Sequence, residues 1–288
     1  MGVIIIQIRR PLLIILMFVV AISFIITNNT KNDEELNDKI ITIQGVVKGK
    51  IEKKRYNQYK VGVFLINDYT KNKNLKIGQK VNITGKFKSL DKMKYDDFDY
   101  GRYIKSTGYK GIVYINNYKI IDKNKLYSLI GEIKFYISKT YRYLYKKNSD
   151  FINSILLAEV ENLTEEQKEI FTRTGTSHVI SISGLHTGIL CVIISFLLRG
   201  INKLYKLLIL SIFITLYCIM VGASPSIIRS IAFVMIFYLS IFIDRKKDGI
   251  SALSLIGIIL IMNNPYVIYN VSFQLSFLAT LSILIFYN

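Results

Sequence analysis

Cysteine and histidine are scarce in this sequence of 288 residues. The two cysteines, Cys191 and Cys218, both lie in apolar runs, so the polar N-terminal half has no disulfide framework available to it. The two histidines, His178 and His186, lie eight residues apart with no carboxylate close to them in the sequence. Because a metal site needs three or four ligands at close range, we expect neither a metal nor another cofactor.

Charged residues are scarce in the C-terminal part alone. Residues 176–288 carry seven basic and two acidic side chains, whereas residues 28–149 carry 27 Lys and Arg against 12 Asp and Glu. We interpret the C-terminal part as membrane-embedded and residues 28–149 as an aqueous, basic region. AT-rich codons favour Lys, Asn, Ile and Tyr, however, and this explanation of the basic excess, without any anionic partner, stays open.

Several apolar runs are long enough to cross a membrane. Arg9 and Arg10 precede an uncharged run that ends at residue 27, and because SFIITNNT offers no small-residue cleavage site, we expect an uncleaved anchor rather than a signal peptide. The segment 250–262 is short for a span, with 13 residues. It either crosses with help from neighbouring residues or tilt, or is re-entrant, so four or five further spans are expected. They lie near residues 179–198, 207–222, 226–243, 250–262 and 267–287.

The loops between these runs predict the orientation of the chain. Basic residues occur in the loops near Arg199 and Arg245, while the loops near Ala223 and Asn263 contain no Lys or Arg. The positive-inside rule therefore puts both basic loops and the N-terminus in the cytoplasm. Residues 28–175 then lie outside, and their lysines do not affect the orientation because long domains translocate largely regardless of charge.

The outer region has the pattern of a small β-barrel. Apolar residues alternate with polar ones in Ile41–Val47 and in Val81–Phe87, and VGVFLIND at 61–68 indicates a more buried strand. Several short strands interrupted by glycine are typical of a barrel of the OB type. We therefore expect an α-helical polytopic membrane protein with a small extracytoplasmic OB-like β-barrel domain.

This barrel has the residues needed to bind a single nucleic-acid strand. Residues 40–120 carry 18 basic against 6 acidic side chains, interleaved with tyrosines, and OB barrels bind single strands by a basic groove and aromatic platforms. Many tyrosines would equally serve the core. The predicted contacts are Lys53, Lys54, Arg55, Tyr56, Lys86 and Lys88.

Two helices are expected between the barrel and the C-terminal spans. From Leu126 to Leu144 apolar residues recur at helical spacing with lysines between them, which predicts an amphipathic helix that lies on the membrane surface or packs against the spans. Thr164 and Gln167 form a capping-box pattern for a short helix running to about Arg173. The predicted domains are residues 1–27, 28–121, 122–175 and 176–288.

The polar stretch FTRTGTSHVISISGLHTG, residues 171–188, opens the C-terminal apolar part. In a continuous helix the two histidines would lie about 80° apart and share a face with two serines, whereas the glycines also permit a broken helix around a water-filled cavity. Polar groups at membrane depth are costly, so we predict a polar path, the alternative being side chains that bond helices together. The predicted path residues here are His178, Ser181, Ser183, Gly184 and His186.

Three polar residues farther along the chain are candidates for the same path. Arg229 is the one charged residue inside the expected C-terminal spans, and its guanidinium either attracts phosphate or reaches the membrane surface. Gln274 and Ser276 line the path or bond between helices. An intramembrane serine protease is the runner-up, but SISG at 181–184 lacks a leading glycine and no distant histidine supplies a base, so we expect no enzyme.

The polar stretch resembles the motif of the ComEC-type competence proteins, inner-membrane channels that take up single-stranded DNA in bacterial transformation. Three further segments are similar to the family: DFDY at 97–100 followed by GRYI, Arg229 in SPSIIRS, and FQLSF at 273–277. The resemblance implies an OB-like domain followed by part of the competence membrane domain. It also implies a phosphate-facing role for Arg229.

The resemblance implies a channel component in the bacterial cytoplasmic membrane, with single-stranded DNA and membrane lipid as partners. Family members continue into a metallo-beta-lactamase-like domain, but this sequence has no HisXaaHisXaaAspHis run, so nuclease activity is not carried over. The missing part would come from a separate chain or other competence proteins. The alternative is a non-transporting remnant or accessory membrane protein.

Overall fold

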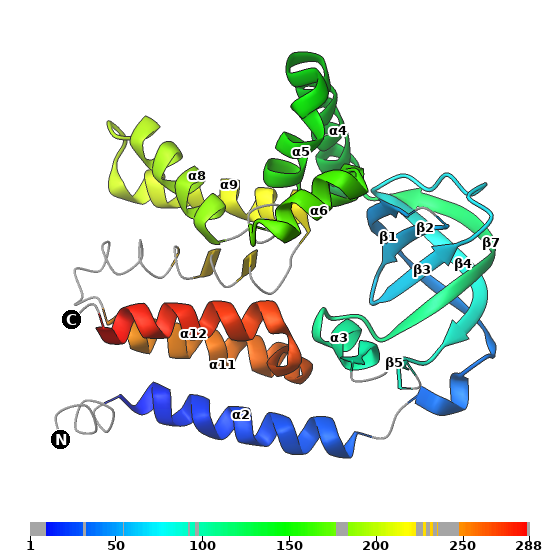
Figure 1. Cartoon of the computed structure of the whole chain (residues 1–288), viewed down its shortest axis with the longest axis horizontal. Coiled ribbons are helices and arrows are strands. Elements are labelled where there is room, and N and C mark those ends of the chain that lie inside the picture. The colour runs from blue at the N-terminus through cyan, green and yellow to red at the C-terminus, as the bar shows by residue number, and fades with distance from the viewer. Residues whose placement is uncertain are drawn as a thin grey trace.

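The chain folds into a β-barrel, a helical arm and a set of apolar helices (Figure 1). In Figure 1 the barrel lies to the right, the arm stands above, and the apolar helices extend to the left. The computed structural model describes residues 10–30, 33–53, 55–91, 93–95, 98–176, 184–222, 227–228, 231–232, 235 and 248–286.

The barrel is closed by five strands in the order β1-β2-β3-β7-β4. β3 and β7 pair in parallel, and the other neighbours pair antiparallel. The alternating patterns correctly predicted β1 and β4, whereas the single strand expected over residues 61–68 is divided by a turn at Gly62 and Val63. The strands are β1 (Ile40–Glu52), β2 (Asn57–Val61), β3 (Phe64–Asp68), β4 (Gln79–Lys88) and β7 (Gly111–Lys123).

The barrel interior is filled by alternate side chains of all five strands. Val47, Ile66, Ile83 and Val113 are fully buried there, and Tyr59 joins them with its hydroxyl donating to the carbonyl oxygen of Lys73. Burial of this kind supplies most of the stabilisation of a small domain. The interior is therefore a packed core, and any ligand of the barrel must bind on its outside.

A short segment between β4 and β7 covers one outer face of the barrel. It contains the hairpin of β5 (Lys94–Tyr95) and β6 (Phe98–Asp99), followed by α3 (Tyr100–Ser106). Ile104 of α3 packs with outward-facing Leu65 and Ile112 in a second core cluster. This cluster attaches α3 firmly to the barrel wall.

The helical arm follows β7 directly. Its first helix, α4 (Lys125–Tyr145), confirms the predicted amphipathic helix, and Asn124 caps it by accepting from the Tyr127 amide. α5 (Ser149–Leu157) packs back against α4, with α6 (Glu165–Arg173) beyond it. The capping box of Thr164 and Gln167 is confirmed at the start of α6. Short 3₁₀ turns η2 (Lys146–Asn148) and η3 (Val160–Asn162) join these helices.

Outside the barrel and the arm, the described residues include five apolar helices. Two of them, α2 (Pro11–Asn29) and α9 (Lys203–Val221), are long and apolar enough to cross a membrane, each with 19 residues. The shorter ones match three of the expected spans, and the expected span 226–243 lies almost entirely outside the described residues. They are α8 (Gly184–Leu197), α11 (Gly249–Asn263) and α12 (Val271–Phe286).

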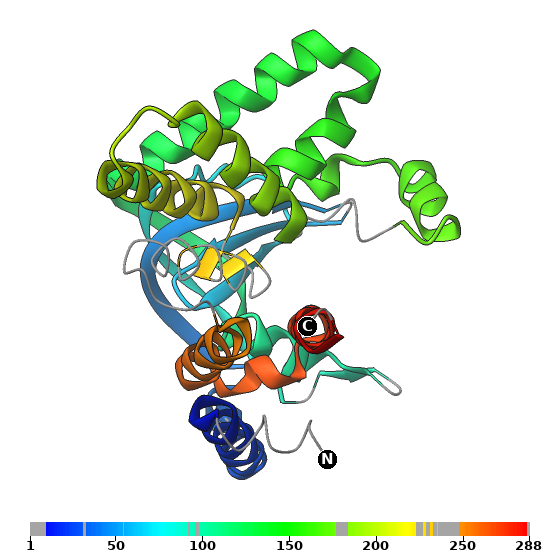
Figure 2. The same ribbon diagram turned by 90° about the vertical axis from the view of Figure 1, so that its left-hand side faces the viewer.

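α2, α11 and α12 lie side by side, as Figure 2 shows by viewing them nearly along their axes. Gly257 permits this approach, because a Cβ there would lie 2.9 Å from Leu16 of α2 and 3.0 Å from Phe277 of α12. At the end far from the barrel, Arg10 pairs with Asp248 at 3.5 Å. At the barrel end, the turn η4 (Pro265–Tyr269) joins α11 to α12.

Gly85 provides a test of the barrel closure. A Cβ at Gly85 would overlap the backbone carbonyl oxygen of Tyr114, at the irregularity in the β4–β7 pairing, so Gly85→Ala should lower the free energy of unfolding by about 1–3 kcal/mol. Gly49→Ala is the matched control, because its Cβ would meet only the flexible stem of Lys60, at 3.3 Å. Urea unfolding of the full chain in detergent, followed by tyrosine fluorescence, measures both; equal effects would contradict the assignment.

Candidate functional site

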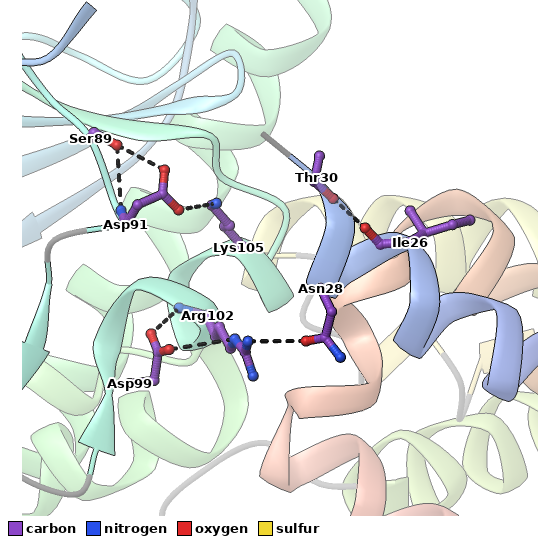
Figure 3. Close-up of polar contacts among 8 residues, drawn as sticks. All are labelled: Ile26, Asn28, Thr30, Ser89, Asp91, Asp99, Arg102 and Lys105. Atoms are coloured by element: carbon purple, nitrogen blue, oxygen red, sulfur yellow. Dashed lines mark hydrogen bonds and ion pairs between the residues drawn. The ribbon is translucent and has the colours of Figure 1, made fainter. Parts of the chain in front are cut away.

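α3 joins the barrel to the apolar helices, and Figure 3 shows its polar contacts. Asp99 caps α3 by accepting from the Arg102 amide at 2.8 Å, and its second oxygen lies 3.5 Å from the Arg102 guanidinium. The guanidinium also donates to Asn28 at the end of α2, at 3.2 Å, and stacks over the ring of Tyr269 at 4.9 Å. One arginine thus contacts the outer domain, α2 and η4 together.

The carboxyl end of α3 is bound by two asparagines from the far end of the sequence. Asn264 donates to the carbonyl oxygens of Lys105 and Ser106, at 2.8 and 3.3 Å, and Asn270 donates to the Ser106 hydroxyl at 3.1 Å. The last carbonyls of a helix have no partners within the helix, so these bonds satisfy groups that otherwise require water. Lys105 also pairs with Asp91 at 2.5 Å, on the barrel side.

The segment DFDYGRYI, singled out from the sequence, therefore has a structural role within its described residues. Gly101 follows the cap, and a Cβ there would overlap the carbonyl oxygen of Leu90. The Gly101 amide donates to Met93 at 3.1 Å. Only glycine permits this approach of α3 to the preceding loop.

A second polar cluster lies where the barrel, the arm and α9 meet. Lys134 of α4 lies 4.0 Å from Glu159, whose carboxylate also accepts from Ser138 at 3.1 Å and Asn162 at 3.0 Å. Lys60 of β2 approaches the end of α9, where a Cβ on Gly222 would lie 3.9 Å from its ammonium.

Burial disturbs the titration of both lysines. Desolvation lowers the pKa of Lys60, and the carboxylate of Glu161 offsets part of this effect. Desolvation likewise lowers the pKa of Lys134, with Glu159 opposing it and the charge of Lys60 adding to it. Burying the two ammonium groups at this junction costs free energy, and the carboxylates of Glu159 and Glu161 offset part of that cost.

Three tyrosines form a row across the outside of the barrel, which we call the tyrosine row: Tyr56, Tyr69 and Tyr114. Ring centroids lie 4.9 Å apart between the first two and 5.9 Å apart between the last two. Tyr69 is 55% exposed and occupies the middle of the row. The tyrosine row therefore offers adjacent aromatic surfaces to a ligand outside the barrel.

Basic residues lie at both ends of the tyrosine row. Lys53 donates to the Tyr56 hydroxyl at 3.1 Å, with its ammonium 5.1 Å from the ring centroid. Lys86 is the register partner of Tyr114 on β4, so both side chains point to the same face. Lys86 and Lys88 share the carboxylate of Asp38, at 3.0 and 4.0 Å. Arg55 is exposed in the β1–β2 turn, and the predicted contact Lys54 lies outside the described residues.

The predicted path residues are only partly described. His178, Ser181, Ser183 and Arg229 lie outside the described residues, so their shared path stays a prediction. Gly184 is the first residue of α8, and His186 lies half-buried in the first turn of that helix.

Gln274 and Ser276 lie on α12, in a different layer of helices from α8 (Figures 1 and 2). Gln274 donates to the carbonyl oxygen of Ile268 at 2.6 Å, which binds α12 to η4. α8 packs against α9, and α12 packs against α11 and η4. A path formed jointly by α8 and α12 therefore stays a prediction.

Within the described ranges there is no group of three or more His, Cys, Asp and Glu side chains suited to a metal ion. Sequence reasoning missed Tyr114 of the tyrosine row, the Lys60–Lys134 cluster and the two asparagines at α3. Each depends on contacts between residues far apart in the chain, for which no local pattern exists.

The chain is similar to competence proteins. The family described as Competence protein matches residues 155–288. ComE operon protein 3 of Bacillus subtilis (strain 168) is 26% identical over 165 residues, which cover 57% of this chain and 21% of that protein. An uncharacterized protein of Aquifex aeolicus (strain VF5) is 30% identical over 125 residues, which cover 43% of this chain and 30% of that protein. The chain thus spans less than a third of either relative's length.

Among solved structures, aspartyl tRNA synthetase from Entamoeba histolytica overlaps 60% of this chain and 37% of its own, at 11% identity. The TM-score of 0.23 is too low to carry an argument about fold.

The lysine cluster predicts a pH dependence of stability. Because the folded-state pKa of Lys60 is lowered, the unfolded chain binds more protons just below pH 10.5, and stability rises with pH there. Lys60→Met should reduce this rise, by less than about 1.4 kcal/mol per pH unit, the limit for one proton. Urea unfolding between neutral pH and about pH 10, where unfolded tyrosines begin to ionise, measures the rise. Lys119→Met, at an exposed site on β7, is the control, and an equal reduction there would refute the prediction.

Proposed function

We infer from the match of residues 155–288 that the chain is a competence protein of the ComEC type. On that premise we propose that it is a channel component that carries single-stranded DNA across the bacterial cytoplasmic membrane during natural transformation. The observation that carries this proposal is the match of the whole C-terminal apolar part to the family, combined with a barrel whose outer face bears aromatic and basic residues. No covalent chemistry is proposed for the chain.

The arrangement of helix ends supports a multi-pass topology with the barrel outside. Arg10 and Asp248 meet at one end of the α2, α11 and α12 group, and the barrel and α3 lie at the other end. The loop between α8 and α9 contains Arg199 and is followed by Lys203 and Lys206 in the first turn of α9. It lies at the same left-hand side of Figure 1 as the start of α2 and the end of α12. Basic loops concentrated at one end agree with a cytoplasmic position for that end.

The barrel is proposed to be of the OB type and to guide the strand outside the membrane. Five strands in a closed barrel are compatible with that type. Bases of a single strand stack on exposed aromatic rings whatever their sequence, and lysines beside the rings attract the phosphates. The tyrosine row with Lys53 and Lys86 offers both kinds of contact on one face.

Inside the membrane, the proposed path is lined by His178, Ser183, His186 and Arg229. An arginine facing lipid at a helix centre costs about 2.5–3.5 kcal/mol, which favours an inward position beside other polar groups. The path contacts phosphates rather than base edges, as transport without sequence preference requires. The remainder of a complete uptake channel is proposed to come from further segments or partner chains.

Tyr69 tests the DNA-binding part of the proposal. Tyr69→Ala removes the middle ring of the tyrosine row and should weaken binding of an oligothymidylate by about 1–3 kcal/mol, whereas Tyr69→Phe keeps the ring face and should bind nearly as well. Fluorescence anisotropy of the full chain in detergent at low salt measures both. Tyr145→Ala, which removes an exposed tyrosine from the arm, is the control. Equal loss in both alanine variants would contradict a role for the row, and no binding at low salt would leave codon composition as the explanation of the charge.

His186 tests the path. In a transformable strain that carries this chain as its own copy, His186→Ala and Arg229→Ala should each lower the transformation frequency roughly tenfold, the effect of losing about 1.4 kcal/mol of interaction along the path. Val192→Ala removes an exposed apolar side chain from the same helix and should have no effect. Immunoblots of membrane fractions confirm equal amounts. Wild-type frequencies in both polar variants would instead indicate a non-transporting remnant or accessory protein.

A further inference from the structure

α4 has an exposed apolar face that no described element covers. α4 contacts α5 and α9, and Ile130 and Ser138 on its buried side are 7% and 6% exposed. Ser138 accepts a hydrogen bond from Asn153 of α5 at 3.2 Å. A second set of apolar side chains recurs at helical spacing on a different side and is between 46% and 81% exposed. We call it the α4 apolar face: Leu126, Leu129, Ile133, Tyr136, Tyr143 and Leu144.

The charges around the α4 apolar face are almost all positive. Residues 125–147 contain six basic side chains and one acidic side chain, Glu132. Among the basic ones, Lys134 is engaged with Glu159, whereas Lys139, Arg142, Lys146 and Lys147 are exposed. An apolar stripe with tyrosines beside a basic stripe is the composition of helices that lie in the interface of an anionic membrane.

The position of α4 fits the same surroundings. In both views α4 runs across the direction of α2, α11 and α12. In Figure 1 it lies above the ends of these helices that face the barrel. The arm is fixed there to a candidate span, because Tyr217 near the end of α9 donates to the carbonyl oxygen of Leu156 at 3.1 Å. A membrane crossed by α9 would therefore have its outer surface close to α4.

We propose that α4 lies in the outer interface of the membrane, with the α4 apolar face among the upper acyl chains and its exposed basic residues on anionic lipid headgroups. The proposal rests on the proposed membrane position of the chain. A second copy of the chain is the less suitable occupant, because pairing two α4 helices along this face would bring their basic residues together. The lipid headgroups instead supply the opposite charge.

The test measures which side of α4 contacts lipid, in the full chain reconstituted in bilayers of phosphatidylcholine and phosphatidylglycerol. In a Cys191→Ser, Cys218→Ser background, single cysteines at Ile133 or Leu129 carry an environment-sensitive nitrobenzoxadiazole label. Arg142→Cys is the matched control, half a turn away on the same exposed helix. Labels at Ile133 and Leu129 should have blue-shifted emission and be quenched at least twofold more by nitroxide-labelled lipid than the label at Arg142.

Two results would overturn the proposal. If nitroxide-labelled lipid quenched the labels at Ile133, Leu129 and Arg142 equally, and iodide in solution quenched all of them, α4 would lie in water. Cross-linking of Ile133→Cys between two chains, without lipid quenching, would assign the face to a second copy. A label at Phe18 of α2 separates this failure from failure of the membrane proposal, because quenching at Phe18 alone would leave the anchor in place and refute only the position of α4.

The contact of the basic residues with anionic headgroups is tested by changing the lipid composition. Quenching at Ile133 should increase when phosphatidylglycerol replaces part of the phosphatidylcholine, and the double variant Lys146→Gln, Lys147→Gln should lose that increase. The same increase in the double variant would refute the role of these lysines at the headgroups.

Discussion

The arrangement of the whole molecule depends on the polar contacts of one short helix. α3 has seven residues, yet its two ends contact the barrel loop, the end of α2 and the turn between α11 and α12. Its last carbonyl groups need partners, which Asn264 supplies, and Asn270 donates to the Ser106 hydroxyl. Both asparagines come from a part of the chain more than 150 residues away. Without these bonds, buried polar groups at this contact would be left unpaired, at a cost of about 1–3 kcal/mol each. The contacts of α3 therefore set the orientation of the barrel relative to the apolar helices.

Several lysines of the outer region are paired within the folded structure and are not offered to a ligand. Lys105 pairs with Asp91, and Lys73 donates to the carbonyl oxygens of Ile115 and Asn116. Lys60 and Lys134 are drawn into the junction with α9 and the arm. A count of lysines in the sequence thus overstates the charge offered to a ligand, and the part that remains beside the tyrosine row is more specific evidence than the total.

Elements with a strong local pattern could be predicted from the sequence. The alternation at Val81–Phe87, the helical period of α4 and the capping box at Thr164 each depend on neighbours within a few residues. The parallel pairing of β3 with β7 could not be predicted, because it joins strands more than 40 residues apart, and the division at Gly62 depends on a turn hidden in an apolar run. The candidate site divides in the same way: Tyr56 and Lys86 were predicted from composition, while their connection through Tyr69 and Tyr114 exists only once the barrel is closed.

Polar groups fix both ends of α11. Asp248 caps its start, and Asn264 at its end donates to α3. Its 15 residues span roughly 22 Å, at about 1.5 Å per residue, whereas the hydrocarbon core of a bilayer is about 30 Å thick. Most of its side chains face protein rather than the surroundings, including Leu253, Ile256 and Ile261. In a membrane crossed as proposed, the bilayer beside α11 must be locally thinned or screened by the neighbouring helices. The barrier to a charged solute would then be thinner beside α2, α11 and α12 than in the surrounding bilayer.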